Sequence, residues 1–569
     1  MSFPTPDSAA AGTRATTAGA ALFTLAAGAL LAAGAALLAP ADALAIPGER
    51  PGAPVPTPAG LADRERGITL PKRDVHYART RYYAEDIPDG DYVHASPAAH
   101  EAFRDIKFSI RIHWGVYAKV PCDASWPFLW YSNQKKDAYN ELYKTFNPVR
   151  FDAERWMQFF KRCGMQAFAF TTKHHDGFSM FHTKTRVKQR VQYTGDGAPR
   201  IVPCDTTYSI ADTPFKRDIV KELCDAAHKN DIKIDLYFSH PDWFDADFRP
   251  YNSHPLMTEN EQQHPHDFGH DRRIGGRRTM TPEPTAEERA RMVARHREQL
   301  REILTNYGKI DMVCLDQWLG KDVWPETRET VKLMRQWSPD TLFRCRGIGN
   351  YGDYFQPEGF VPGAKENTNM PWMAICKLAR WFSYDPEAKR YRGAPWVIKN
   401  LVDCVAKGGS FMVCIGPDEF GEFHPEAVRQ LEQVGDWLRV NGEGIYNTRS
   451  RLNWREGEAK KSDKKNDAKP ATGSTGSTRT VIKYTQTKDK KFIYGFFENW
   501  PADGVLTLKT FRIKPGSRVT LLGAPDAPIT WTQPATGGTA KITLPAALTA
   551  DPAKRPCQTA WALKFEVQP

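Results

Sequence analysis

The chain has 569 residues, of which 41% are hydrophobic, 25% charged and 12% aromatic. This length exceeds what one hydrophobic core normally supports, so a globular protein with two folded domains is expected. The net charge of +11 does not indicate a nucleic-acid partner, because much of the excess is local: residues 460–469 alone hold five Lys among polar residues, the pattern of a solvated linker.

The N-terminal residues have the pattern of a secretory signal peptide. Residues 18–45 form an Ala/Leu-rich run that follows Arg14 and ends on a small-x-small cleavage pattern at Ala45. The run is also long enough to anchor a chain in a membrane, but Asp42 and the small residues favour cleavage. We expect residues 1–45 to be removed and the mature chain to be secreted or periplasmic, without stable membrane insertion.

Two folded units follow a Pro- and charge-rich segment, residues 46–99, which is expected to wrap the outside of the main domain. Regular structure is expected from about residue 107, where residues 108–115 alternate like a strand and carry His113 to its end. Asp152 then caps an amphipathic helix that Gly164 stops.

The next strand, within residues 168–178, is an apolar run that ends abruptly on a polar tip containing His174 and His175. The same unit of helix followed by buried strand returns three more times, with strands at residues 232–239, 312–315 and 410–415. Such alternation predicts a parallel sheet, and over residues 100–446 a (β/α)8-like TIM-type barrel.

Two long inserts, residues 184–212 and 244–284, are predicted to be irregular loops at the catalytic face. The second insert contains four His residues. A metal site there is one interpretation, but the pattern lacks Cys or helical His spacing, so a polar loop is favoured. The four residues are His254, His264, His266 and His270.

Residues 447–569 are predicted to form a C-terminal antiparallel β-sandwich. A Lys/Ser/Gly-rich linker at about 457–477 precedes short alternating runs separated by turn residues. The expected strands are residues 481–484, 492–497, 505–508, 519–522, 529–531, 542–544 and 563–567. The ten Cys are scattered without metal-type spacing, so most are predicted to be free core thiols, although export would permit a disulfide.

Asp316 is the strongest candidate for chemistry, because it ends an apolar strand and is closely followed by Trp318. A carboxylate there can attack the anomeric carbon of a sugar, or it can be a structural cap. A proton donor would then be needed, and Glu358 and Glu366 are the downstream candidates. Arg344 and Arg346 come from an intervening strand end, where one could bind substrate or Asp316 and the other be structural.

At these residues the sequence resembles the α-L-fucosidases of glycoside hydrolase family 29. The matching motifs include His113-Trp-Gly, Lys173-His-His-Asp-Gly-Phe and Asn441-Gly-Glu-Gly-Ile-Tyr, in the right order across residues 100–446. The resemblance implies a retaining exo-glycosidase with no metal or other cofactor, acting on fucosylated oligosaccharides or glycoconjugates. It assigns Asp316 as nucleophile and Glu358, then Glu366, as acid/base. The sugar-binding residues it implies are His113, Trp130, His174, His175, Tyr237 and Arg346. Trp318, close to Asp316 in the chain, is a further candidate for substrate binding.

Two departures bear on the substrate. Leu129 and Met373 stand where many members carry Glu, which would remove acceptors from around the sugar. This leaves two alternatives open: a related α-L-glycosidase for an L-galactose-like sugar, and a fucose-binding protein on a degenerate barrel. A metal-dependent barrel hydrolase is a weaker third interpretation. Oligomeric state is left open.

Overall fold

The computed structural model describes residues 77, 80, 83–85, 88–120, 122–194, 199–249, 254–256, 284–362, 370–457, 480–536 and 538–568. All of these belong to one compact unit that begins at residue 46. The predicted signal peptide, residues 1–45, lies outside the described residues, as does the predicted linker from residue 458 to 479.

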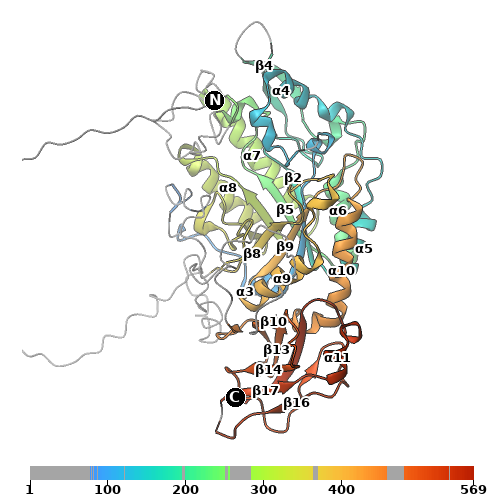
Figure 1. Cartoon of the computed structure of the whole chain (residues 1–569). Helices are drawn as coiled ribbons and strands as arrows, with labels where there is room; N and C mark the ends of the chain where they lie inside the picture. The colour runs from blue at the N-terminus through green and yellow to red at the C-terminus, as the bar shows by residue number, and fades with distance from the viewer. Residues whose placement is uncertain are drawn as a thin grey trace, which may run out of the picture. The chain divides into compact units, whose positions relative to one another are not determined.

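A parallel sheet forms the centre of the larger domain (Figure 1). Its seven strands are ordered β7-β6-β5-β2-β1-β9-β8, so strands that follow one another in the chain are mostly neighbours in space. The strands are β1 (Phe108–Ile112), β2 (Ala167–Lys173), β5 (Lys233–Ser239), β6 (Met312–Asp316), β7 (Leu342–Phe343), β8 (Met373–Lys377) and β9 (Ser410–Ile415).

The gap between the edge strands β7 and β8 is bridged by residues 353–359. Isolated parallel bridges join Arg344 to Tyr354 on one side, and Phe355 to Trp372 and Glu358 to Ile375 on the other. Backbone hydrogen bonds run from Phe355 N to Pro371 O (2.9 Å) and from Gly359 N to Ile375 O (2.8 Å). The irregular segment therefore closes the sheet, and the predicted TIM-type barrel is confirmed.

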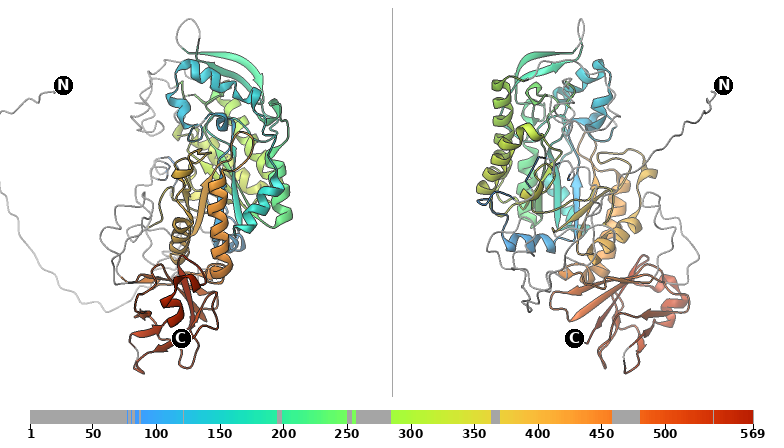
Figure 2. Two further views of the ribbon diagram at one scale, coloured as in Figure 1. Left: turned by 45° about the vertical axis from the view of Figure 1, so that its right-hand side comes forward. Right: turned by 90° about the vertical axis from the view of Figure 1, so that its left-hand side faces the viewer.

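Helices surround the sheet, as two further views show (Figure 2). They begin where the sequence provides caps: Asp152 accepts from Arg155 N at the start of α5, and Asp218 from Lys221 N at the start of α6. The helices of the larger domain are α3 (Pro97–Asp105), α4 (Asn133–Asn140), α5 (Ala153–Arg162), α6 (Ile219–Asn230), α7 (Ala286–Thr305), α8 (Trp324–Trp337), α9 (Ala394–Ala406) and α10 (Pro425–Asn441), while α11 (Ala546–Ala550) belongs to the C-terminal domain.

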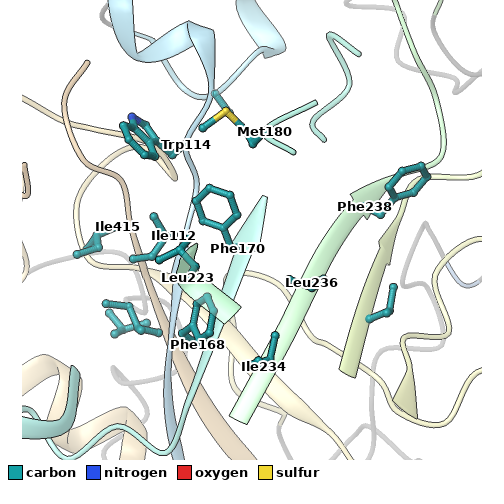
Figure 3. Close-up of a cluster of buried hydrophobic side chains, with 14 of the residues drawn as sticks. Ile112, Trp114, Phe168, Phe170, Met180, Leu223, Ile234, Leu236, Phe238 and Ile415 are labelled. Carbon is teal, nitrogen blue, oxygen red and sulfur yellow. The ribbon is translucent and has the colours of Figure 1, made fainter. Parts of the chain in front are cut away.

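The barrel strands have two apolar faces, as expected when helices cover a parallel sheet. Alternate residues of β1, β2, β5 and β9 point outward into a fully buried cluster, which Figure 3 shows together with Leu223 of α6. The labelled side chains include Ile112, Phe168, Phe170, Ile234, Leu236, Phe238 and Ile415. This packing fixes the strand register and hence the positions of the side chains at the strand ends.

Two local expectations were wrong. Regular structure begins before residue 107, because Ser96 caps α3 and Pro97 is compatible with its first turn. The insert at residues 184–212 is not irregular: it contains an antiparallel hairpin of β3 (Val187–Gln192) and β4 (Arg200–Thr206). The alternation of Val187 and Val191 with polar neighbours was a strand signal that the composition of the insert obscured.

The C-terminal domain is antiparallel, as predicted. One sheet has the order β10-β12-β13-β18-β15 with β11 beside β12, and a second has the order β14-β17-β16. Their strands are β10 (Thr448–Arg449), β11 (Arg455–Glu456), β12 (Ile482–Thr487), β13 (Phe492–Phe497), β14 (Val505–Leu508), β15 (Thr520–Leu521), β16 (Thr530–Thr532), β17 (Ala540–Thr543) and β18 (Trp561–Glu566).

Contacts between α9 and the first sheet include a partly buried ion network: Asp403 lies 2.7 Å from Lys407 Nζ and 3.2 Å from Lys483 Nζ. All ten cysteines are free, and eight of them are buried, in agreement with the sequence. Within the described residues, no helix has both the length and the apolar character needed to cross a membrane.

Candidate active site

The polar residues singled out from the sequence lie at the carboxyl ends of the barrel strands. His113 directly follows β1, His174 and His175 follow β2, and Asp316 is the last residue of β6. Because parallel strands in a barrel present their carboxyl ends at one rim, side chains from distant parts of the chain meet there. Contacts between these residues confirm that convergence.

Asp316 is the centre of this group, with only 7% of its surface exposed. Tyr237 donates its hydroxyl to Asp316 Oδ2 at 2.5 Å, and Arg346 Nη1 donates to Oδ1 at 2.6 Å. Burial raises the pKa of Tyr237 well above its ordinary value, so its hydroxyl remains a donor. Two strong donors stabilise Asp316 as a carboxylate.

Glu358 joins the same guanidinium. Its Oε2 lies 2.9 Å from Arg346 Nη1, the nitrogen that also lies 2.6 Å from Asp316 Oδ1. The two carboxylate oxygens therefore cannot be further apart than the sum of these distances. This upper limit applies to the two oxygens that share Arg346, and it is compatible with the carboxyl separation of about 5–5.5 Å in retaining glycosidases.

The two carboxyl groups differ in exposure. The side chain of Glu358 is 36% exposed, whereas that of Asp316 is 9% exposed. Glu358 is therefore the carboxyl group that water reaches more readily. Glu366, the second acid candidate, lies outside the described residues.

Three buried histidines cover one side of Asp316. The ring of His174 stacks on Tyr237 with a centroid distance of 5.7 Å, and His113 lies 5.3 Å from the same ring. His175 Nε2 is 3.8 Å from Asp316 Oδ2. Burial lowers the pKa of all three, that of His175 to about 4, so the imidazoles are neutral near pH 7.

A serine side chain contacts the Nδ1 atom of each of the two consecutive histidines. His174 Nδ1 is 2.5 Å from Ser125 Oγ, and His175 Nδ1 contacts Ser239 Oγ. A fixed partner at Nδ1 orients the ring and leaves Nε2 for a second contact. Ser125 and Ser239 were missed in the sequence, although Ser239 ends a predicted strand and pairs in register with Asp316.

The turn after His175 needs its glycine. Gly177 has φ +82, and a Cβ there would meet the Asp242 carboxyl at about 2.0 Å. Trp243, which follows that carboxyl, donates its backbone N–H to His175 O at 2.8 Å. The residues that follow β2 therefore pack tightly against Asp242 and Trp243, which follow β5.

The backbone beside Asp316 is equally tight. Gln317 has φ 62, a left-handed conformation that few residues other than glycine adopt. Gly347, with φ +80, packs against it, since an added Cβ would lie 2.4 Å from Gln317 O. This close approach brings Arg346 to Asp316, and strained backbone of this kind is frequent at active sites.

The aromatic candidates separate into two environments. Trp130 is 54% exposed on a short 3-10 helix (Trp126–Trp130), while Trp318 is 2% exposed and belongs to the interior. Trp126 was not singled out from the sequence, yet its ring lies 4.6 Å from that of His175. Its proximity to Trp130 in the chain was the only signal.

The structure corrects the interpretation of Met373. This residue begins β8, is fully buried, and accepts a hydrogen bond from Ser109 Oγ at 3.4 Å in the barrel interior. It pairs with Ser410, the first residue of β9, so it lies at the opposite end from Asp316. Leu129 is also buried, in the main hydrophobic cluster. The loss of a carboxylate at Met373 therefore does not alter the rim.

The histidine-rich insert provides little chemistry in its described part. His254 is buried, and its Nδ1 accepts from Leu256 N at 3.1 Å. Burial lowers the pKa of His254 to about 3, so it is neutral. His264, His266 and His270 lie outside the described residues, and no group of metal-ligating side chains is found among those that are described.

Two family models match the chain. An α-L-fucosidase model covers residues 83–443, which is more than half of the chain, and an α-L-fucosidase C-terminal domain model covers residues 476–566. These ranges coincide with the barrel and with the antiparallel sheets. The plasma α-L-fucosidase of Homo sapiens is 27% identical over 484 residues, which span 81% of this chain and 88% of the human one.

Solved structures share the fold. The α-L-fucosidase isoenzyme 1 of Paenibacillus thiaminolyticus is 24% identical with a TM-score of 0.60, covering 83% of this chain and 99% of its own. A family 29 α-L-fucosidase of Bacteroides thetaiotaomicron, solved as a trapped covalent intermediate, is 21% identical with a TM-score of 0.60 over 85% of this chain and 98% of its own. The chain therefore belongs to the α-L-fucosidase family of glycoside hydrolases, family 29.

Proposed function

We propose that this protein is a secreted, retaining exo-glycosidase that removes terminal α-L-fucosyl residues from glycans through a covalent glycosyl-enzyme. One observation carries the proposal: Arg346 Nη1 lies 2.6 Å from Asp316 Oδ1 and 2.9 Å from Glu358 Oε2, which brings the two carboxyl groups close together and supports a retaining pair. The Bacteroides structure, trapped as a covalent intermediate, supports the same chemistry.

In the first step, Asp316 attacks the anomeric carbon of fucose. The bond between that carbon and the leaving oxygen breaks, and Glu358 donates its proton to the oxygen. Tyr237 and Arg346 hold the Asp316 carboxylate in position by their hydrogen bonds. As the ester forms, Asp316 loses its negative charge and Glu358 gains one. Because Arg346 contacts both carboxyl groups, its guanidinium lies beside the negative charge before and after the step.

In the second step, Glu358 accepts a proton from water, and the resulting hydroxide oxygen attacks the anomeric carbon. The ester bond to Asp316 breaks and restores the carboxylate, and the proton taken from water leaves Glu358 protonated for the next cycle. The exposed side chain of Glu358 gives water access to this step. Net configuration is retained because each displacement inverts it.

The neutral imidazoles of His113, His174 and His175 would bind the sugar hydroxyls. A neutral imidazole can both donate and accept, and near pH 7 it carries no charge that would oppose Arg346. Trp130 would contact the sugar or its neighbour at the exposed rim, since an aromatic face suits the C–H groups of a sugar ring. Trp318, being interior, would support the rim rather than touch substrate.

The test is hydrolysis of an aryl α-L-fucoside followed by proton NMR. The expected first product is α-L-fucose, which later mutarotates. A β-L-fucose first product would contradict retention, and fucose binding without turnover across aryl and oligosaccharide fucosides would favour a sugar-binding protein. An aryl α-L-galactoside in parallel tests the related sugar, which differs from fucose by one hydroxyl.

A further inference from the structure

A layer of charged side chains lies inside the barrel directly beneath the rim. Arg344, which directly follows β7, lies 3.5 Å from Asp316 Oδ1 and 3.8 Å from Glu358 Oε2. Its side chain is only 1% exposed. A second guanidinium, buried and separate from Arg346, is thus nearly equidistant from both carboxyl groups of the candidate active site.

The side chain of Arg344 is fixed from below. Its Nη1 contacts Cys314 Sγ at 3.1 Å, and Nη2 donates to Gln356 O at 3.5 Å. Arg111 contacts the same Cys314 Sγ at 2.8 Å and donates to Gln356 Oε1 at 2.6 Å. Both arginines therefore donate hydrogen bonds to Gln356, which precedes Glu358 by two residues.

Residues of the neighbouring strands leave room for these arginines and provide a negative charge beside them. Ala169 of β2 pairs in register with both Arg111 of β1 and Asp235 of β5, and its small side chain leaves room for theirs. Asp235 Oδ2 is 4.0 Å from Arg111 Nη2. Burial raises the pKa of Asp235 to about 6 against the opposing effects of Arg111 and Arg344. The layer and the rim together contain the guanidinium groups of Arg111, Arg344 and Arg346 and the carboxyl groups of Asp235, Asp316 and Glu358.

We propose that Arg344 is a positioning residue for the reaction: with Arg346 it spans the Asp316 and Glu358 carboxyl groups and sets the pH range in which one is ionised and the other protonated. This inference rests on the proposed function. During glycosylation negative charge moves from Asp316 to Glu358, and a guanidinium at similar distance from both stabilises it throughout. Arg346 contacts both directly, and Arg344 adds a second positive charge from inside the barrel.

Other groups also face the two carboxyl groups, and all of them remain in an Arg344 variant. They come from β5, β6, β9 and the segments that follow β1, β2, β5 and β7. They are His113, His174, His175, Tyr237, His240, Cys314, Arg346 and Cys414.

The test compares pH profiles of kcat/KM for Arg344→Gln and Arg344→Lys with the unmodified protein. Under the proposed mechanism the acid limb reports ionisation of Asp316 and the alkaline limb reports protonated Glu358. Loss of a nearby positive charge raises carboxyl pKa values by about one to two units. We expect Arg344→Gln to move both limbs upward by about that amount and Arg344→Lys to leave them near their original pH.

Arg335→Gln is the matched control. Arg335 is also a buried guanidinium, paired with Asp353 at 2.6 Å, and it supports the same closing segment without contacting Asp316 or Glu358. It should lower thermal stability while leaving both limbs unmoved. Unmoved limbs in Arg344→Gln, or equal shifts in the Gln and Lys variants, would overturn the inference. Absence of hydrolysis in the unmodified protein would instead overturn the proposed function.

If Arg344→Gln does not fold, Arg344→Lys decides alone. A lysine ammonium keeps the charge but loses the planar contacts to Cys314 and Gln356. The inference then expects lower stability with unchanged limbs, and shifted limbs in a folded Arg344→Lys would contradict it.

Discussion

At the scale of single residues, the position of the Asp316 carboxylate depends on hydrogen-bond donors from other parts of the barrel. Tyr237 comes from β5 and was placed in the site only by resemblance to a family, whereas Arg346, which follows β7, was also a candidate from its position near a strand end. The histidines were visible as strand tips, but the sequence did not show that Ser125 and Ser239 fix their rings. A side-chain partner on another element leaves no trace in local spacing.

Tyr237→Phe should lower kcat for an aryl α-L-fucoside by about 10- to 100-fold. The change removes a hydrogen bond to a charged group, worth about 1.5–3 kcal/mol, without changing the shape of the ring. Steady-state kinetics check this expectation. Tyr354→Phe is the matched control, since Tyr354 is an equally buried barrel tyrosine whose hydroxyl has no hydrogen-bond partner among the described residues. Equal losses in both variants would contradict the assigned role.

At the scale of elements, the segment at residues 353–359 determines where Glu358 lies. Asp353 anchors its start: the carboxylate pairs with Arg335 at 2.6 Å and accepts from Phe343 N at 2.8 Å and Ala95 N at 3.1 Å. Burial would raise the pKa of Asp353, but Arg335 and nearby histidines lower it far below its ordinary value. Its stabilising effect is therefore present above about pH 4 and is lost as the pH falls further.

Asp353→Ala should lower the free energy of unfolding by about 3–5 kcal/mol, because it leaves the Arg335 guanidinium buried without its anion. Urea unfolding followed by tryptophan fluorescence measures the change. The matched control is Asp205→Ala, which removes contacts to Arg186 and Lys188 at an exposed site and should hardly move the midpoint. A midpoint for Asp353→Ala equal to that of Asp205→Ala would show that the anchor contributes nothing.

The elements that could be predicted from the sequence were those in which apolar residues recur at the spacing of a helix or a strand. Strand β9 was predicted with its observed limits, and α5 was found from its cap, its apolar face and Gly164. The closing segment was not predicted, because it contains Pro357, has no apolar run, and pairs through isolated bridges. The charged layer was missed for a similar reason: Arg111 and Asp235 in alternating strands suggest a solvent-facing side, whereas both point into a barrel interior.

At the scale of the whole molecule, buried titratable groups make stability depend on pH. Among the residues that the structure describes, burial lowers the pKa of seven histidines, which are neutral in the folded chain and charged in the unfolded one below about pH 6.5. Buried Asp176, Asp235, Asp245 and Glu302 have raised pKa values and act in the opposite direction. The histidines are His94, His113, His174, His175, His240, His254 and His296.

Because the histidines outnumber these acids, the unfolded chain binds more protons than the folded one between about pH 4 and 6.5, and stability should rise with pH across that window. Calorimetry at pH 4.5, 5.5 and 6.5 should therefore give an increasing Tm. His254→Gln should reduce the slope, because the buried His254 imidazole is neutral in the folded chain. A Tm that is constant or falls from pH 4.5 to 6.5 would contradict the burial of neutral imidazoles.

The central claim is that Asp316 forms the covalent bond and Glu358 moves the proton. Azide rescue of the Ala variants tests it, because the anomer of the fucosyl azide product reports which group was removed. Asp316→Ala with azide should yield β-L-fucosyl azide by a single inversion, and Glu358→Ala should yield the α anomer by attack on the glycosyl-enzyme. The same anomer from both variants, or undiminished turnover without azide, would contradict the assignment.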